Sequence, residues 1–384
     1  SYDLDFVSFD KEETDNASLC RLTLKSNIKP VEITVCTLLD GSQMFSRWLE
    51  IKNLSYKPLC VNKLALISGG LEDMDTDHLK GTSDKSDLYS LGYFDDDSWG
   101  HEGQFRWRSL NPDTTAIDGR FLRDRFRHPI IFLKNNVMGH IWFCQIGYSV
   151  GYRFSIDYNA KPFKDESHLS FKAEITGHSP VLVLKPFEEF TTPEVHIGMV
   201  HGNLDCAINE MHTHTRKSVL NNKFADPIPA LIGCGMGAEH NMDIIGSKAF
   251  IDQFAEMGGE VFIVDAGWVC PPHEETSWGD YNGLNTTDEN RYPNGIKEIR
   301  DYAHEKGLKF GLWMDIENIG RLCPLFDERT DFRSDNVFGT KNPRLIDMSI
   351  PKVSEWAENE LSRVIEEYEL DLLRVDYNVD YTEY

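Results

Sequence analysis

The sequence has 384 residues, and because domains usually run about 100–200 residues, we expect two domains. Lys and Arg number 39 against 63 Asp and Glu, which gives a formal charge of −24. This charge argues against nucleic acid and anionic membranes as partners, because both need a basic face. No apolar run approaches the roughly 18 residues of a membrane helix, and the longest, Pro129–Leu133, predicts a strand.

The N-terminus and the cysteines bear on the compartment. The chain opens with Ser-Tyr-Asp-Leu-Asp-Phe, which is not a secretion signal, so we expect a cytoplasmic protein. Because there is no initiator Met, export with removal of an upstream segment stays open as the alternative. Eight cysteines run from Cys20 to Cys323 without a Cys-x-x-Cys pair. We expect them to be free thiols, since a chain of this size needs no disulfides.

Residues 1–200 are predicted to form a β-sandwich domain. Apolar and polar residues alternate over 169–176, which is the period of a half-buried strand, and Val31, Ile33 and Val35 repeat the pattern. The segments Gly139–Ile146 and Val181–Leu184 are typical of more fully buried strands. Many short strands without helical periods favour a sandwich.

Residues 201–384 are predicted to alternate strands with helices. The expected strands are Ala230–Ile232, Val261–Asp265, Leu308–Trp313 and Leu370–Asp376. A helix is expected over 205–220, and three more follow the first three strands. Gly258 and Gly307 mark the ends of two of these helices, and Pro351 suits the first turn of the last.

Four strand–helix units ending on a strand imply a parallel sheet. We predict the first half of a (β/α)₈ TIM barrel, with the other half outside this chain. A doubly wound sheet is the alternative, but no Gly-x-Gly-x-x-Gly turn follows a strand at a dinucleotide-binding spacing.

Chemically active side chains stand at the carboxyl ends of the last three predicted strands. These ends are Asp265-Ala-Gly-Trp268, Trp313-Met-Asp315-Ile-Glu317 and Arg374-Val-Asp376-Tyr-Asn378. In a barrel such ends converge on one mouth, where active sites lie. Carboxylates, a cation, an amide and tryptophans together favour a sugar site.

The stretch from about residue 205 to 384 resembles the catalytic domain of glycoside hydrolase family 36, the melibiase-type α-galactosidases. Six segments carry the resemblance in the family's order and spacing: Val264-Asp-Ala-Gly-Trp268, Gly279-Asp280-Tyr281, Tyr292-Pro-Asn-Gly-Ile296, Gly307-Leu-Lys-Phe-Gly-Leu-Trp313, Leu345-Ile-Asp-Met-Ser349 and Arg374-Val-Asp376-Tyr-Asn378. The resemblance implies a retaining exo-α-glycosidase that acts on terminal α-linked galactose-type sugars of an oligosaccharide or glycoconjugate, without a cofactor, and commonly as a homo-oligomer.

The resemblance also implies a role for each site residue. Asp376 would be the nucleophile that forms a covalent glycosyl-enzyme. Arg374 would bind ring hydroxyls and help to keep Asp376 ionised. The remaining substrate-binding residues would be Asp265, Trp268, Trp313, Asp315, Lys341 and Asn378, with Glu317 beside Asp315 and with Arg344 as the alternative to Lys341.

Two departures from the family pattern leave the sugar open. Ala266 stands where the family has a second aspartate, and Gly233–Gly237 replaces a segment that contains a tryptophan. We therefore expect a roomier pocket, with N-acetylgalactosamine as the favoured alternative to galactose and a sugar without the 6-hydroxyl next. Two further functions stay open, that of a transglycosylase and that of a non-catalytic carbohydrate-binding fragment.

The general acid/base is expected outside this chain, because the family places it on a later strand than the nucleophile. Residues 1–384 alone are therefore expected to show no hydrolysis. No metal site is predicted, since His212 and His214 belong to the helix before the first barrel strand and lack further ligands.

Overall fold

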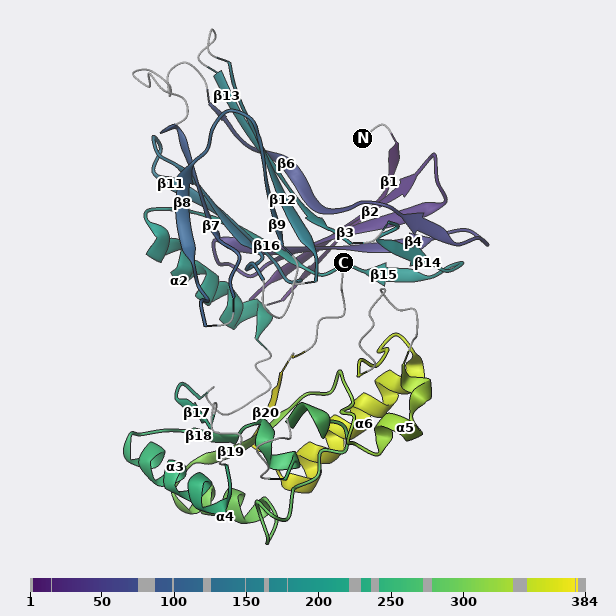
Figure 1. Ribbon diagram of the computed structural model, residues 1–384. Coiled ribbons are helices and arrows are strands. Elements are labelled where there is room, and N and C mark those ends of the chain that lie inside the picture. The colour runs from purple at the N-terminus through teal and green to yellow at the C-terminus, as the bar shows by residue number, and fades with distance from the viewer. Residues whose placement is uncertain are drawn as a thin grey trace. The chain divides into compact units, whose positions relative to one another are not determined.

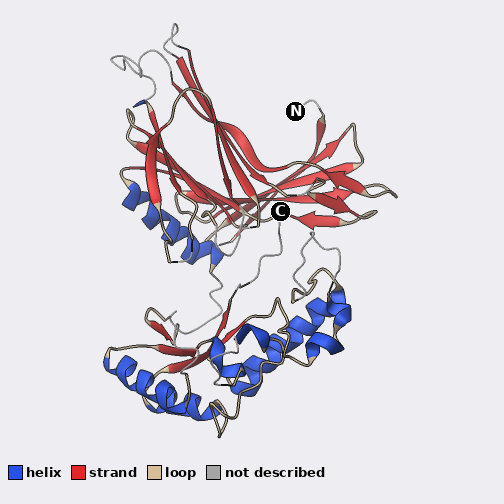
Figure 2. Ribbon diagram, in the orientation of Figure 1, coloured by secondary structure: helices blue, strands red, loops and turns tan. Residues whose placement is uncertain are grey.

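The computed structural model describes residues 3–14, 16–74, 87–98, 100–119, 126–148, 150–161, 166–177, 179–220, 229–235, 242–271, 278–333, 344–376 and 378. The chain forms two compact units, Ser1–Phe224 and Ala225–Tyr384 (Figure 1). Strands dominate the first unit, whereas the second combines strands with helices (Figure 2).

The first unit contains a ten-stranded sheet of order β1-β2-β3-β4-β16-β11-β10-β7-β8, in which β15 also pairs with β4, and a four-stranded sheet of order β6-β13-β12-β9. A short pair, β14-β5, accompanies them. The strands are β1 (Leu4–Glu13), β2 (Ser18–Ser26), β3 (Val31–Leu39), β4 (Met44–Asn53), β5 (Leu59–Val61), β6 (Leu64–Met74), β7 (Tyr89–Phe94), β8 (Phe105–Ser109), β9 (Thr114–Gly119), β10 (Ile130–Asn135), β11 (His140–Ile146), β12 (Tyr152–Lys161), β13 (Glu166–Ile175), β14 (Leu182–Leu184), β15 (Glu189–Thr191) and β16 (Val195–His201).

The two larger sheets share one apolar core, as the predicted sandwich requires. Leu91 and Ile131 come from the larger sheet, and Phe154 and Phe171 come from the smaller one. The predicted alternation on β13 is confirmed, because its apolar residues from Leu169 to Ile175 are all buried. Burying one face of each sheet against the other is the main apolar contribution to this unit's stability.

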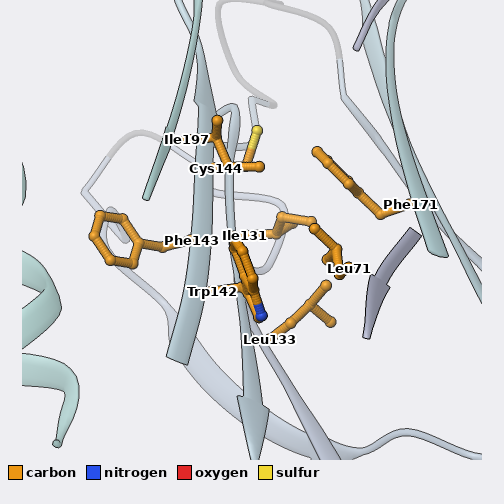
Figure 3. Close-up of a pocket in the computed structure, with 8 residues that line it drawn as sticks. All are labelled: Leu71, Ile131, Leu133, Trp142, Phe143, Cys144, Phe171 and Ile197. Carbon is orange, nitrogen blue, oxygen red and sulfur yellow. The ribbon is translucent and has the colours of Figure 1, made fainter. Parts of the chain in front are cut away.

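A small apolar pocket lies within this packing (Figure 3). Its lining comes from five strands, β6, β10, β11, β13 and β16, and consists of Leu71, Ile131, Leu133, Trp142, Phe143, Cys144, Phe171 and Ile197. None of these side chains carries a charge, and burial raises the pKa of the Cys144 thiol far above its ordinary value, so the pocket offers no acid, base or thiolate for sugar chemistry.

Helix α2 (Leu204–His214) belongs to the first unit. Asn203 caps it by accepting a hydrogen bond from the backbone N–H of Cys206. Ala207 is buried against the outer face of the large sheet, in a cluster with Phe132 and Phe143. Because this apolar face packs on the sheet, the first unit extends through α2 and the π-helical turn η2 (Thr215–Val219) to residue 224, later than the expected boundary at residue 200.

A buried polar cluster fastens α2 to the large sheet. His214 lies between Asp40 and Ser46, with its Nδ1 at 2.7 Å from Asp40 Oδ2 and its Nε2 at 3.2 Å from Ser46 Oγ. His196 Nδ1 lies 2.9 Å from Ser46 Oγ and 3.0 Å from His214 Nε2. Burial, then the neighbouring His214, lowers the pKa of His196 to about 4. Burial alone would raise the pKa of Asp40, but hydrogen bonds from Ser42, Ser218 and His214 lower it to about 2.

The second unit is a parallel sheet of order β17-β18-β19-β20, so its strands follow one another in chain order. A doubly wound sheet reverses its order in the middle, and this one does not. The strands are β17 (Ile232–Cys234), β18 (Val261–Val264), β19 (Lys309–Met314) and β20 (Leu372–Val375); the helices are α3 (Ile244–Glu256), α4 (Lys297–Glu305), α5 (Leu325–Glu328) and α6 (Pro351–Tyr368); and the 3₁₀ turns are η3 (Ala266–Val269), η4 (Trp278–Asp280) and η5 (Thr330–Phe332).

The helix ends follow the expected signals. Asp243 caps α3 through the backbone N–H of Gly246, and Gly258 follows the helix with a φ of 81°. Pro351 occupies the first turn of α6, where its missing N–H costs no hydrogen bond. The four predicted strands are confirmed within two residues at each end.

Helices α3, α4 and α6 all pack on the same face of the parallel sheet (Figure 1). Phe262 on β18 and Phe310 on β19 point into the core that these helices share. The opposite face carries Trp313, which pairs in register with Arg374 on β20, and also Cys234 on β17.

Side chains of the first and fourth strands meet across this opposite face, which is called the concave face below. The two strands would stand roughly 14 Å apart in a flat sheet, at about 4.8 Å for each neighbouring pair. The long side chain of Arg374 reaches from β20 to place its Nη1 at 3.1 Å from the Sγ of Cys234 on β17. Side chains of all four strands therefore come together on this face.

Candidate active site

Asp376 lies one residue beyond β20. Its backbone N–H donates to the carbonyl of Met314 at 2.8 Å, which continues the ladder between β19 and β20 and fixes the start of the side chain. Its Oδ2 accepts a hydrogen bond from Nε1 of Trp313 at 2.8 Å and lies 3.6 Å from Nη2 of Arg374. The carboxylate thus lies close to an indole N–H donor and to a guanidinium on the concave face of the sheet.

Asp265 ends β18 and stands on the other side of Arg374. Its Oδ1 accepts from the backbone N–H of Ala266 at 2.8 Å, which starts the turn η3. Its Oδ2 lies 3.7 Å from Nη1 of Arg374 and 3.3 Å from the Sγ of Cys234. The side chain of Asp265 is only 5% exposed, so protein atoms rather than solvent surround most of it.

Asp315 follows β19 and is 1% exposed. Its Oδ2 accepts from Nδ2 of Asn378 at 3.2 Å, and its Oδ1 accepts from the backbone N–H of Glu317. Burial raises the pKa of Asp315 against the lowering effect of these bonds, and the charge of Asp376 raises it further. Asp315 is therefore a buried acceptor that holds the side chain of Asn378, and its own oxygens are not exposed to solution.

Glu317 lies beside Asp315 and is partly buried. Burial, then the charge of Asp315, raises the pKa of Glu317 to about 7. A carboxyl group with this pKa exchanges its proton near neutral pH. Asp315 and Glu317 thus bring two carboxyl groups of raised pKa to the edge of the sheet where Asp376 lies.

The structure separates the two predicted tryptophans. Trp313 is 1% exposed and forms the floor under Asp376. Trp268 is fully buried among the helices: it packs edge-on against Tyr368 and donates from Nε1 to the backbone carbonyl of Trp313 at 2.8 Å. Trp268, which was expected to bind substrate, therefore has its side chain in the core among the helices, because η3 turns it away from the concave face.

Trp278 is an aromatic residue of the site that was not predicted from the sequence. It begins η4, is partly exposed, and packs edge-on against Trp313 with 4.9 Å between ring centroids. Its position directly before the matched Gly279-Asp280-Tyr281 segment was the available signal. Cys234, which contacts both Asp265 and Arg374, was not predicted either.

Lys341, which was expected to bind substrate, lies outside the described residues. The alternative, Arg344, places its Nη2 at 2.6 Å from Oδ1 of Asp280. The carbonyl of Arg344 also accepts a hydrogen bond from the backbone N–H of Ile319, in the loop after β19. Arg344 is thus anchored at η4, beside Trp278.

Neither a metal centre nor a membrane helix is found in the part of the chain that the structure describes. Across those residues, no group of three or more His, Cys, Asp or Glu side chains is arranged to hold a metal ion. Among the helices found there, none has the length and apolar character needed to cross a membrane.

Carboxylates, a guanidinium and an indole N–H gathered at the carboxyl ends of parallel strands are typical of an enzyme site. The melibiase family matches residues 189–384, which is more than half of the chain. The chain therefore belongs to the melibiase family, the α-galactosidase-type proteins of glycoside hydrolase family 36.

Curated relatives agree with this assignment. The chain is 25% identical over 252 residues to alpha-galactosidase Mel36A of Lactobacillus acidophilus, which covers 64% of this chain and 33% of that protein. It is 25% identical over 359 residues to alpha-galactosidase 2 of Hypocrea jecorina, with coverage of 86% and 44%. The chain thus spans less than half the length of these relatives.

Solved structures share the fold. The alpha-galactosidase of Lactobacillus brevis matches with a TM-score of 0.76 and 18% identity over 96% of this chain and 50% of that one. A variant of the alpha-galactosidase AgaA of Geobacillus stearothermophilus, solved with stachyose, matches with a TM-score of 0.77 and 18% identity over 97% and 52%. Both the β-rich first unit and the parallel sheet of the second therefore have counterparts in α-galactosidases.

Proposed function

We propose that this protein acts as a retaining exo-α-glycosidase on terminal α-linked galactose-type sugars, with Asp376 as the nucleophile. The observation that supports this most directly is the position of the Asp376 carboxylate, which lies at a strand end between the Trp313 indole N–H and the Arg374 guanidinium. The relatives carry α-galactosidase names, and one solved neighbour holds stachyose.

The proposed chemistry has two displacement steps. Asp376 attacks the anomeric carbon while the glycosidic oxygen leaves with a proton from a general acid, and the product is a glycosyl ester on Asp376. Water then attacks the same carbon with help from the conjugate base, which releases the sugar and the free carboxylate. Overall the anomeric configuration is retained. We propose that the general acid stands on a strand later than β20.

We also propose that β17–β20 form the first half of a (β/α)₈ barrel. Three features support this: the strands follow chain order, the helices pack on one face, and side chains of the outer strands meet on the other face. The solved neighbours that match nearly all of this chain are about twice as long. Sugar binding on the concave side would use Asp265, Arg374 and Asn378 as polar partners and Trp278 as an aromatic wall.

The packing at Gly235 does not decide which sugar fits. A Cβ added there would lie 1.8 Å from the methyl carbon of Met242, and Met242 belongs to the core that the helices share on the other face of the sheet. A roomier pocket for N-acetylgalactosamine would therefore have to arise from the small residues on the site face or from Ala266. Galactose remains the sugar that we propose first.

Covalent labelling with an activated fluorinated galactosyl fluoride tests the nucleophile. Fluoride leaves without protonation, so the test does not require the general acid. We expect a single glycosylated peptide containing Asp376. Asp376→Asn should abolish the label, whereas Asp327→Asn on exposed helix α5 should leave it unchanged. A label on another residue, or none on the wild type, would contradict the proposal.

A panel of nitrophenyl α-glycosides tests the sugar, with a protein that also contains the later strand proposed to supply the general acid. The α-galactoside is expected to be the best substrate, and a faster N-acetylgalactosaminide would favour the roomier pocket. Product analysis with acceptor oligosaccharides separates hydrolysis from transglycosylation. Saturable galactose binding without labelling or turnover would instead identify a carbohydrate-binding protein.

A further inference from the structure

Cys234 occupies an unusual position on the concave face. Its Sγ accepts a hydrogen bond from Nη1 of Arg374 at 3.1 Å and lies 3.3 Å from Oδ2 of Asp265, to which the thiol donates. Burial, then the charge of Asp265, raises the pKa of the Cys234 thiol to about 11. At neutral pH the group therefore keeps its proton, and it links the cation to the carboxylate as both acceptor and donor.

Arg374 stands midway between two carboxylates without closing onto either. Its Nη1 is 3.7 Å from Asp265, and its Nη2 is 3.6 Å from Asp376. Charge-assisted hydrogen bonds between guanidinium and carboxylate normally close to about 2.8 Å. The thiol is the nearer partner of Nη1, at 3.1 Å. Cys234 thus takes the place that a direct ion pair with Asp265 would otherwise fill.

Building on the glycosidase function proposed above, we propose that Cys234 is a positioning residue that holds the Arg374 guanidinium between Asp265 and Asp376. Held there, Arg374 keeps its charge close to the nucleophile and keeps N–H groups available for sugar hydroxyls. Without the thiol, Nη1 would move toward the buried Asp265, and Nη2 would be drawn away from Asp376. The consequence would be a nucleophile with a higher pKa and a weaker contact to the sugar.

Two variants separate this role from simple packing. Cys234→Ala removes both hydrogen bonds, whereas Cys234→Ser keeps a donor and an acceptor at the same place. Cys60→Ala, at an exposed thiol on β5, is the matched control. Thermal unfolding of all three variants checks that each one folds. If Cys234→Ala does not fold, Cys234→Ser still tests the proposal, because a displaced Arg374 in that variant would contradict it.

The first measurement is independent of activity. Crystal structures of the wild type and Cys234→Ala should show the Arg374–Asp265 distance closing to a direct ion pair and the Arg374–Asp376 distance growing. Cys234→Ser should keep the wild-type arrangement. An unmoved Arg374 in Cys234→Ala would overturn the proposal, whatever the protein does to sugars.

The second measurement is the pH dependence of the labelling rate at Asp376. In Cys234→Ala the acid limb should move up by about one pH unit, because an opposite charge at this distance lowers a carboxyl pKa by about 1–3. Labelling on the acid side should then be about tenfold slower, and Cys234→Ser and Cys60→Ala should follow the wild type. A lower rate with an unshifted acid limb would point to a packing role only. If the wild type is not labelled, the proposed function fails, while the crystal structures still decide the role of Cys234.

Discussion

The buried pair His196 and His214 predicts a specific loss of stability in mild acid. The pKa of His196 is about 4 in the folded protein, against an ordinary value of 6.5. Because the folded pKa is the lower one, the unfolded chain binds the proton first as the pH falls. The stability contributed by neutral His196 is therefore complete above pH 6.5 and is lost progressively down to about pH 4.

The size of the effect follows from the two pKa values. Their difference of about 2.5 corresponds to about 3 kcal/mol, at 1.36 kcal/mol for each pKa unit. Asp40 does not contribute in this window: its pKa is lowered from 3.8 to about 2, so its share is lost only below about pH 4. Glu194, with Oε2 at 3.8 Å from Nε2 of His196, and Lys217, which donates to the Asp40 carbonyl, are the other charged groups close to the pair.

Native-state hydrogen exchange at the amides of β4 and β16 measures the free energy of unfolding of this unit at pH 7 and pH 4. We expect it to fall by about 3 kcal/mol in the wild type. In His196→Gln the decrease should largely disappear, whereas His212→Gln, on the exposed side of α2, should retain it. A histidine NMR titration that gives His196 a pKa near 6.5, or a decrease that persists in His196→Gln, would refute the reasoning.

Three further predictions concern the second unit. Trp313→Phe removes the N–H donor to Asp376; a hydrogen bond to a charged group contributes about 1.5–3 kcal/mol, so the labelling rate should fall roughly tenfold to a hundredfold. Trp268→Ala should cost about 3–5 kcal/mol in urea unfolding, because a fully buried tryptophan leaves a cavity among the helices. Gly320→Ala should cost about 1–3 kcal/mol, because its Cβ would lie 2.2 Å from a backbone carbonyl; the control Gly177→Ala, in the first unit and with nothing within 4 Å, should leave the urea midpoints of both units nearly unchanged.

Local patterns predicted most of the elements. The period-two alternation of β13 depends only on which face of the strand is buried, and the start of α6 depends only on Pro351, and both were correctly predicted. The unit boundary could not be predicted in this way. The apolar face of helix α2 could pack on the sandwich or on the parallel sheet, and the sequence pattern is the same in both cases. In the structure it packs on the sandwich.

The candidate site was predictable to the level of strand ends. Asp265, Trp313, Arg374 and Asp376 lie together because they end neighbouring parallel strands, which spacing alone indicates. The direction of a side chain beyond a strand end depends on the turn that follows. The turn η3 sends Trp268 into the core, and no residue pattern signals this. Cys234 joins the site because the long side chain of Arg374 reaches across the sheet from β20 to β17, which depends on the order of all four strands.

The four-stranded sheet has a consequence for handling the protein. β17 and β20 stand at its two margins, and each pairs along only one side within the described chain. A strand at a margin offers its remaining backbone amides and carbonyls to any other extended segment that comes near. Such margins can template the addition of strands from the same protein, or recruit foreign strands and lead to aggregation. The solubility of this unit should therefore depend on what covers those two margins.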